Sequence, residues 1–404
     1  MYCSENAKST AESGSDSWPW LGVWDPIVSE LARQQDAASP GHPGSVVNPI
    51  CGVPYILDTC CAARVFATEY RRTDETQWKK RADDAVRAAR TVRLFPGISE
   101  PVWDVLGWHD APESLPPTGM AVDAYWGALD LLGLPLDQDD ARDLLEFLSR
   151  CRGGGGGFAH NALIKGREAA EVQNATASTL NIMGRLALES EAESHPLYEK
   201  LDAALSRLRQ GQSTSGFWPY HYPGSRLREA LSKLPFAVLL RPRRFFSYNG
   251  HGDVMHHLMT LYFSTGFFLS SRRRAETGML ASGWAWIKKQ LVRGQPGGLC
   301  INWEVDPAPQ SPRFSNSRDT NAYFLMLATI PRLADLGIVD KDESGHIAKE
   351  ILLHIGSNLM SEAGCTPCVI PHEGPPEILR NILPMFEQSV AWKGCLLSEM
   401  IRTR

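Results

Sequence analysis

The sequence predicts an all-α protein of the (α/α)6 toroid type, in which six helical hairpins surround a central cavity. Apolar, helix-like stretches recur roughly every 55 to 80 residues. Amphipathic helices with one charged face alternate with them. No segment of comparable length has the two-residue period of a β-strand. Twelve helices of two alternating kinds pack naturally as an inner and an outer ring.

The inner helices are expected where small and apolar residues occupy most helix faces, which is typical of buried helices. In chain order these stretches are 48–66, 118–134, 174–188, 252–268, 319–338 and 387–404. The outer helices are expected where charges fall on one face and Leu, Val or Ile on the other. These segments are 24–35, 79–95, 137–151, 195–211, 277–294 and 345–360.

Glycine and aromatic residues occupy the connections from each outer helix to the next inner one. Examples are GGGGGF at 153–158 and SGFWPY at 215–220. Glycine permits a tight turn and a close backbone approach, and the following ring fills the space between hairpins. Residues 18–404 are therefore expected to form one domain after a polar leader at 1–17, which has no apolar signal region.

These loops carry a family resemblance. An outer helix ending in charges, then GGF or GxW, then a polar spacer and an inner helix starting with Thr, Ala or Asp, resembles the prenyltransferase/squalene-cyclase repeat. The resemblance runs loosely from about residue 100 onward and is strongest at 137–190 and 206–270. It implies a toroid, and an activity among protein prenyltransferases, triterpene cyclases and class II diterpene cyclases.

The zinc ligands of the protein prenyltransferases are not matched. The resemblance would place an Asp and a Cys two residues apart near Asp253, but Met255 stands at the cysteine position. The later inner helix has Ala322 where the family has its histidine. A zinc-dependent prenyltransferase is not expected, and no cofactor is predicted.

Class II cyclases use the central Asp of a DxDD motif to protonate their substrate. Asp137–Asp140 spells that motif but begins an outer helix, where carboxylates cap free N–H groups. Asp319, in the run 317–322, is expected at the start of an inner helix and is the predicted proton donor. Ser317 and Thr320 replace its flanking acids.

Two further acids are candidates for catalysis. Asp253 shares a helical face with His256 and His257, which allows an Asp–His proton donor, a divalent metal site or a core hydrogen-bonding network. Asp123 stands among apolar residues, where desolvation would raise its pKa as a general acid requires. A buried, paired carboxylate is the alternative for Asp123.

The 12 tryptophans outnumber the 10 tyrosines, and many of these rings fall on inner helices or the loops that precede them. They would stabilise carbocations in a ring-lined cavity, although at least half are expected to be ordinary core. The predicted substrate-binding rings are Trp103, Tyr125, Trp126, Trp218, Tyr220, Tyr262, Tyr323 and Trp392.

Charge and hydropathy limit the partners. A net charge of −5 argues against a protein that coats nucleic acid, and no stretch is apolar enough to span a bilayer. The nine cysteines are expected to be reduced thiols of a cytoplasmic protein. Segment 226–246, basic around an apolar run, is interpreted as a peripheral membrane contact, a lid that grips a diphosphate or a surface hairpin.

The leading functional hypothesis is a class II-type terpene or meroterpenoid cyclase, an isomerase or lyase of isoprenoid secondary metabolism with a small hydrophobic substrate. Asp319 would be its acid, with Asp253 and His256 as partners. The alternatives are a carbohydrate-active (α/α)6 enzyme (a glycosidase, epimerase or lyase) using paired carboxylates such as Asp123 and Asp253, and a non-catalytic scaffold. The oligomeric state is left open.

Overall fold

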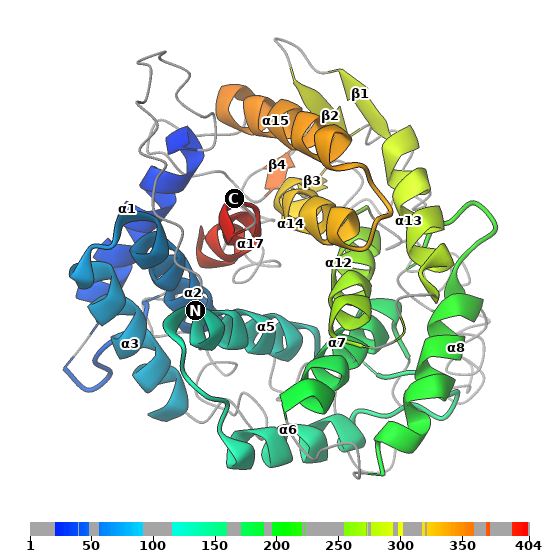
Figure 1. The fold of residues 1–404 in the computed structure, drawn as a ribbon, viewed down its shortest axis with the longest axis horizontal. Coiled ribbons are helices and arrows are strands. Elements are labelled where there is room, and N and C mark those ends of the chain that lie inside the picture. Colours follow the sequence, from blue (N-terminus) through cyan, green and yellow to red (C-terminus); the bar gives the residue numbers. More distant parts are fainter. Residues whose placement is uncertain are drawn as a thin grey trace, which may run out of the picture.

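A computed structural model shows the fold. It describes residues 21–38, 40–47, 56–91, 115–159, 171–189, 196–219, 222, 254–271, 273, 276–293, 298–301, 317–319, 321–358, 369–371 and 390–402. Across these ranges twelve α-helices form two concentric rings (Figure 1). The predicted (α/α)6 toroid is confirmed.

The inner ring consists of six helices, one from each predicted apolar stretch. They are α2 (Ile56–Thr73), α5 (Leu115–Leu132), α7 (Gln173–Glu189), α12 (Val254–Ser270), α14 (Asn321–Asp335) and α17 (Val390–Arg402). Each packs against the next in chain order, and α17 packs back against α2. Because an inner helix meets neighbours on most sides, every residue of α2 from Ile56 to Glu69 is buried.

The outer ring consists of the six amphipathic helices. They are α1 (Leu21–Asp36), α3 (Thr76–Thr91), α6 (Gln138–Arg150), α8 (Leu201–Gly211), α13 (Gly278–Lys289) and α15 (Lys341–Asn358). In α3 the buried residues fall on a single face, at Ala82, Ala85, Val86, Ala88 and Ala89. Small side chains on that face let α3 lie close against α2.

The DxDD sequence at the start of α6 is a helix cap, as predicted. Asp137 is the N-cap residue, and its side chain accepts a hydrogen bond of 2.8 Å from the backbone N–H of Asp139. Asp139 and Asp140 lie in the first turn, where carboxylates interact favourably with the helix dipole. The literal cyclase motif is therefore accounted for by helix stability.

The glycine run before α7 wraps around one carboxylate. The N–H groups of Gly155 and Gly157 donate to Glu171 Oε1 at 2.6 and 3.2 Å. A Cβ at Gly153 would lie 2.3 Å from the Glu171 side chain, so only glycine fits there. Glu171 also pairs with Arg207 at 2.9 Å, which ties the loop to α8. The glycine run thus connects neighbouring hairpins through Glu171.

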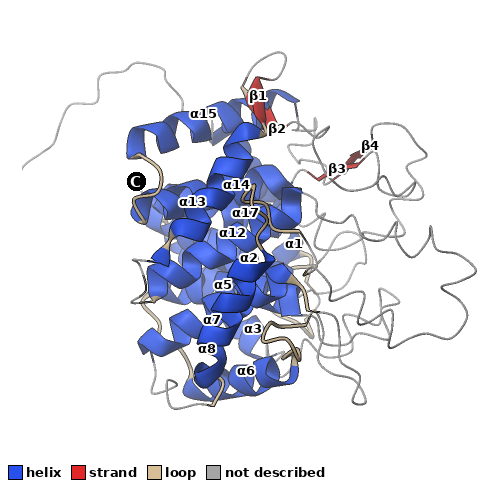
Figure 2. Cartoon of the chain, turned by 90° about the vertical axis from the view of Figure 1, so that its right-hand side faces the viewer, coloured by secondary structure: helices blue, strands red, loops and turns tan. Residues whose placement is uncertain are grey.

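Two short two-stranded antiparallel sheets and a 3-10 turn at Tyr198–Lys200 accompany the helices in the described ranges. β1 (Leu291–Arg293) pairs with β2 (Leu299–Ile301), and β3 (Ser317–Asp319) pairs with β4 (Val369–Pro371). Figure 2 shows β3 and β4 beside the helical body, not within it. Asp319 pairs with Val369, and α14 begins only at Asn321. Asp319, which was expected at the start of the inner helix, therefore lies two residues before α14, and its backbone is paired as a strand.

Candidate functional site

Six polar side chains meet on the axis of the toroid, one from each inner helix. We call this set the axial network. Its members in chain order are Arg64 (α2), Asp123 (α5), Asn181 (α7), Tyr262 (α12), Arg332 (α14) and Glu399 (α17).

Asp123 is the centre of the axial network. Its Oδ2 accepts a hydrogen bond from Tyr262 Oη at 2.6 Å and lies 3.3 Å from Arg332 Nη2. Arg64 Nη1 approaches the same oxygen at 3.5 Å. The other oxygen, Oδ1, accepts from Asn181 Nδ2 at 3.0 Å. Four inner helices are thus joined to α5 through one carboxylate.

Glu399 completes the ring of contacts. Its Oε1 accepts hydrogen bonds from both Arg64 Nη2 and Arg332 Nη2. Two carboxylates therefore share two guanidinium groups, and the four charges balance. Arg332 also donates to Tyr262 Oη at 2.9 Å and lies 3.9 Å above the ring of that tyrosine. Such a cation–π contact adds to the stabilisation of the buried guanidinium.

Two glycines of the inner helices make room for the axial network. A Cβ at Gly127 would lie 2.9 Å from the guanidinium of Arg64. A Cβ at Gly266 would lie 2.1 Å from Asn181 Oδ1 and 2.8 Å from Arg332 Nη1. The long polar side chains reach the axis because these two helices carry no side chain at the point of contact.

The charges set the protonation of the network. Burial acts to raise the pKa of Asp123, but the positive charges of Arg332 and Arg64 outweigh it, and the pKa ends lower than usual. Burial raises the pKa of Tyr262 well above its ordinary value, so the phenol stays protonated. The predicted raised pKa of Asp123 is therefore wrong, because two guanidiniums face this carboxyl.

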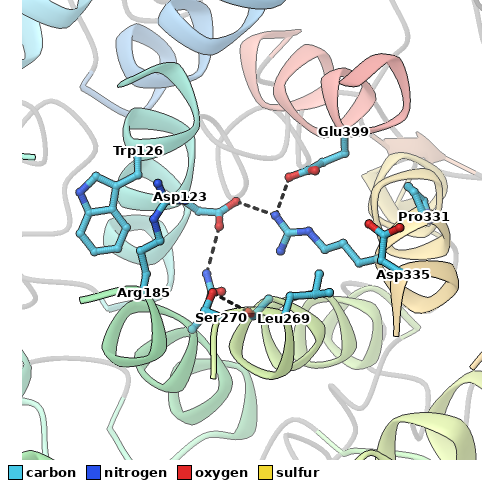
Figure 3. Close-up of a pocket in the computed structure, with 11 residues that line it drawn as sticks. Asp123, Trp126, Arg185, Leu269, Ser270, Pro331, Asp335 and Glu399 are labelled. Atoms are coloured by element: carbon cyan, nitrogen blue, oxygen red, sulfur yellow. Dashed lines mark hydrogen bonds and ion pairs between the residues drawn. The ribbon is translucent and has the colours of Figure 1, made fainter. Parts of the chain in front are cut away.

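The axial network borders a cavity of about 150 Å³ near the C-terminal ends of the inner helices (Figure 3). Its lining residues are Asp123, Trp126, Asn181, Arg185, Gly266, Leu269, Ser270, Pro331, Arg332, Asp335 and Glu399. Carboxylates, guanidiniums and an amide therefore make up much of the wall.

Trp126 and Arg185 form one side of the cavity. The indole of Trp126 is 3% exposed, and its Nε1 has no hydrogen-bond partner within the described part of the chain. The guanidinium of Arg185 lies 5.9 Å from the centre of that ring and is ion-paired with Asp130. An N–H donor buried without a partner costs about 1–3 kcal/mol.

Three of the predicted site residues lie together at the axis, and others lie buried between helices. Asp123 and Trp126 line the cavity, and Tyr262 belongs to the axial network. The remaining described rings are buried between helices and are not among the lining residues: Tyr125, Trp218, Tyr323 and Trp392. Arg90 donates a 2.7 Å hydrogen bond to the hydroxyl of Tyr125, which links α3 to α5.

The histidine pair at the start of α12 divides into a core residue and a half-buried one. His257 accepts a 3.0 Å hydrogen bond from the Trp218 backbone on Nδ1, and its Nε2 lies 3.1 Å from the Gly283 carbonyl. Burial lowers the pKa of His257 to about 3, so the ring is neutral. His257 thus belongs to a core network, whereas His256 is half-buried. No cluster suited to a metal ion occurs among the residues that the structure describes.

Several predicted residues lie outside the described residues: Trp103, Tyr220, Asp253, segment 226–246 and the leader 1–17. For Asp319 only the backbone is described. In the ranges that are described, no helix is long and apolar enough to cross a membrane. The cysteines there, Cys60, Cys61, Cys151, Cys300 and Cys395, are free thiols.

Sequence reasoning missed most of the axial network. Arg64, Asn181, Arg332 and Glu399 are polar residues within stretches whose apolar character was used to identify inner helices. The available signal was the charge of three of them, because a charge in a helix buried on most faces needs a partner.

No family model matches this chain, and no curated protein matches it by sequence. Solved structures do match over nearly the whole length. An unsaturated glucuronyl hydrolase specific for heparin is 12% identical, with 96% of this chain and 97% of that chain covered and a TM-score of 0.60. A D-mannose isomerase is 13% identical, with 98% of this chain and 100% of that chain covered and a TM-score of 0.59. Cellobiose 2-epimerase from Bacillus thermoamylovorans B4167 is 10% identical, with 95% of this chain and 99% of that chain covered and a TM-score of 0.58.

These comparisons correct the functional prediction. The similar toroids are carbohydrate-processing proteins, and none of those reported is a prenyltransferase or a terpene cyclase. The toroid implied by the repeat resemblance is confirmed, but the terpene cyclase and isoprenoid assignment is wrong. The charged cavity has the same implication, because a carbocation cascade needs a largely apolar, aromatic wall.

Proposed function

We propose that this protein is a carbohydrate-active enzyme that binds a saccharide in the axial cavity. One observation carries the proposal: the cavity on the toroid axis has a wall of carboxylates, guanidiniums, an amide and an indole. Sugars present many hydroxyl groups and apolar C–H faces. Charged acceptors and donors bind the hydroxyls, and an aromatic ring packs on the C–H face.

The size of the cavity supports a small polar ligand. At about 150 Å³ it is smaller than the 300–1,000 Å³ typical of pockets for drug-sized ligands. A polyprenyl chain would exceed this space.

The similar solved structures add support of a more general kind. Their names describe a glucuronyl hydrolase, a cellobiose epimerase and a mannose isomerase. The toroid therefore accommodates several reactions on sugars, and fold alone does not choose among them. The proposal for this chain is therefore limited to what these reactions share: a saccharide binds on the axis and is then converted.

Asp123 has a defined part in the proposal. Its lowered pKa keeps it charged at neutral pH, so it would accept hydrogen bonds from sugar hydroxyls and stabilise positive charge. The same lowered pKa makes it a poor proton donor. Asp253, His256 and Asp319 stay predictions for further catalytic groups.

The test measures saccharide binding and turnover together. Wild-type protein is titrated with mannose, cellobiose and an unsaturated glucuronyl disaccharide by calorimetry, and products are followed by NMR. We expect binding of at least one saccharide, weakened about tenfold or more by Asp123→Asn, because a hydrogen bond to a charged group contributes about 1.5–3 kcal/mol.

Asp137→Asn is the matched control, because it makes the same chemical change at a helix cap on the outer ring. It is expected to leave binding unchanged. Circular dichroism establishes that both variants are folded. Folded wild-type protein that binds and converts none of the saccharides would refute the proposed function.

A further inference from the structure

We infer that the axial cavity takes a single uncharged monosaccharide unit and discriminates against sugars that carry a carboxylate. This inference rests on the proposed function and adds the substrate class to it. Two observations carry it: the ion pairing of the cavity's arginines and the excess of acids in its wall.

The arginines in the wall are already neutralised. Arg332 is ion-paired with both Asp123 and Glu399. Arg185 is ion-paired with Asp130. Among the described lining residues, no guanidinium or ammonium group remains without a carboxylate partner. A uronate would therefore have to break an existing pair to obtain a counter-charge.

The wall contains more acids than bases. Asp123, Glu399 and Asp335 face two lining guanidiniums, those of Arg185 and Arg332. Asp335 is exposed at the last turn of α14, and Figure 3 shows its carboxylate across the cavity from Trp126. No ion pair involves Asp335 within the described residues. A second carboxylate brought into this space would be repelled.

The size of the cavity restricts the length of the ligand. The cavity volume of about 150 Å³ limits the ligand to about one sugar ring. A longer saccharide would place only its terminal unit here.

The experiment compares glucose with glucuronate, which differ only in whether C6 is a hydroxymethyl group or a carboxylate. Dissociation constants are measured by calorimetry or ligand-observed NMR on the full chain. We expect glucose to bind about 100-fold or more tightly than glucuronate, since juxtaposed like charges cost several kcal/mol. Adding salt should narrow the difference, because screening weakens the repulsion.

Two substitutions at the rim sharpen the test. Asp335→Arg provides an unpaired cation and should narrow the preference for glucose by about tenfold or more, with Asp335→Asn giving a smaller change. Asp139→Arg is the control, because Asp139 is 80% exposed on the outer helix α6. It should leave the preference unchanged, and circular dichroism verifies that each variant is folded.

The possible results distinguish a failure of this inference from a failure of the proposed saccharide binding. Glucuronate binding as tight as glucose overturns the inference and leaves the proposed function standing. A preference that Asp335→Arg and Asp139→Arg alter equally also overturns it. Failure of all sugars, charged or neutral, to bind overturns both.

Discussion

Replacing Arg332 by methionine tests whether the axial network holds the inner ring together. In the native protein two guanidiniums balance the carboxylates of Asp123 and Glu399. Arg332→Met leaves Arg64 alone to neutralise both, and it removes the donor to the Tyr262 hydroxyl. Loss of one partner from a buried ion pair costs about 3–5 kcal/mol, which is the expected loss in the free energy of unfolding.

The assay is urea unfolding followed by circular dichroism and tryptophan fluorescence. A second variant, Arg332→Met with Glu399→Gln, removes one positive and one negative charge together. It should be more stable than Arg332→Met by about 1 kcal/mol or more, because Arg64 and Asp123 then remain as a balanced pair.

The control removes an arginine from an exposed pair. Arg209 and Glu276 are each about 40% exposed, so Arg209→Met should cost at most about 1 kcal/mol. A loss of stability in Arg332→Met no larger than that of this control would show that the axial network does not hold the inner ring together. A double variant less stable than Arg332→Met would show the same, because the second substitution should restore the charge balance.

Three other predictions concern packing, capping and pH. Gly266→Ala should lower the free energy of unfolding by about 1–3 kcal/mol, because its Cβ would lie 2.1 Å from Asn181 Oδ1. Gly356→Ala on α15, with open space around its Cβ, should instead stabilise by up to about 1 kcal/mol; equal effects in thermal unfolding would contradict this account. Asp137→Ala should cost about 1 kcal/mol in urea unfolding by removing the cap of α6, and an unchanged midpoint would show that the cap contributes nothing. Because the pKa of Asp123 is lowered on folding, its contribution to stability is present above the ordinary aspartate pKa of about 4 and is lost as the pH falls through the folded value. Asp123→Asn should therefore show a weaker loss of stability between about pH 5 and pH 2 in acid unfolding, and an identical pH profile would argue against the ionised pair.

The fold was predictable because its determinants are local. A helix buried on most faces, such as α2, needs apolar residues nearly throughout, and a helix with one wet face, such as α3, needs a 3.6-residue pattern. The alternation of these two patterns specifies two rings. The cap at Asp137 was equally visible, since it depends on a neighbour two residues away.

The axial network was not predictable in the same way. Arg64 and Glu399 are 335 residues apart, and Asp123 and Arg332 are 209 residues apart. Which residue of a buried helix points to the axis depends on the rotation of that helix, which is set by packing against both neighbours. Periodicity gives no such rotation when nearly all faces are apolar.

The glycine-aromatic loops explain why the family resemblance was informative about fold and misleading about function. In GGGGGF the glycines surround Glu171, and Phe158 is buried. In SGFWPY, Trp218 packs against His257. These motifs determine how one hairpin joins the next. The polar groups on the axis come from other residues.

Ring closure by α2 and α17 has a consequence for the order in which the molecule assembles. The contact between these two helices links distant parts of the chain, so forming it carries a large loop-closure entropy. Arg64 and Arg332 lack a full set of counter-charges until Glu399 arrives, so the partly closed ring is penalised electrostatically. We expect amides of α17 to gain protection last in pulsed hydrogen exchange during refolding, after α2 has packed against its chain neighbours α3 and α5.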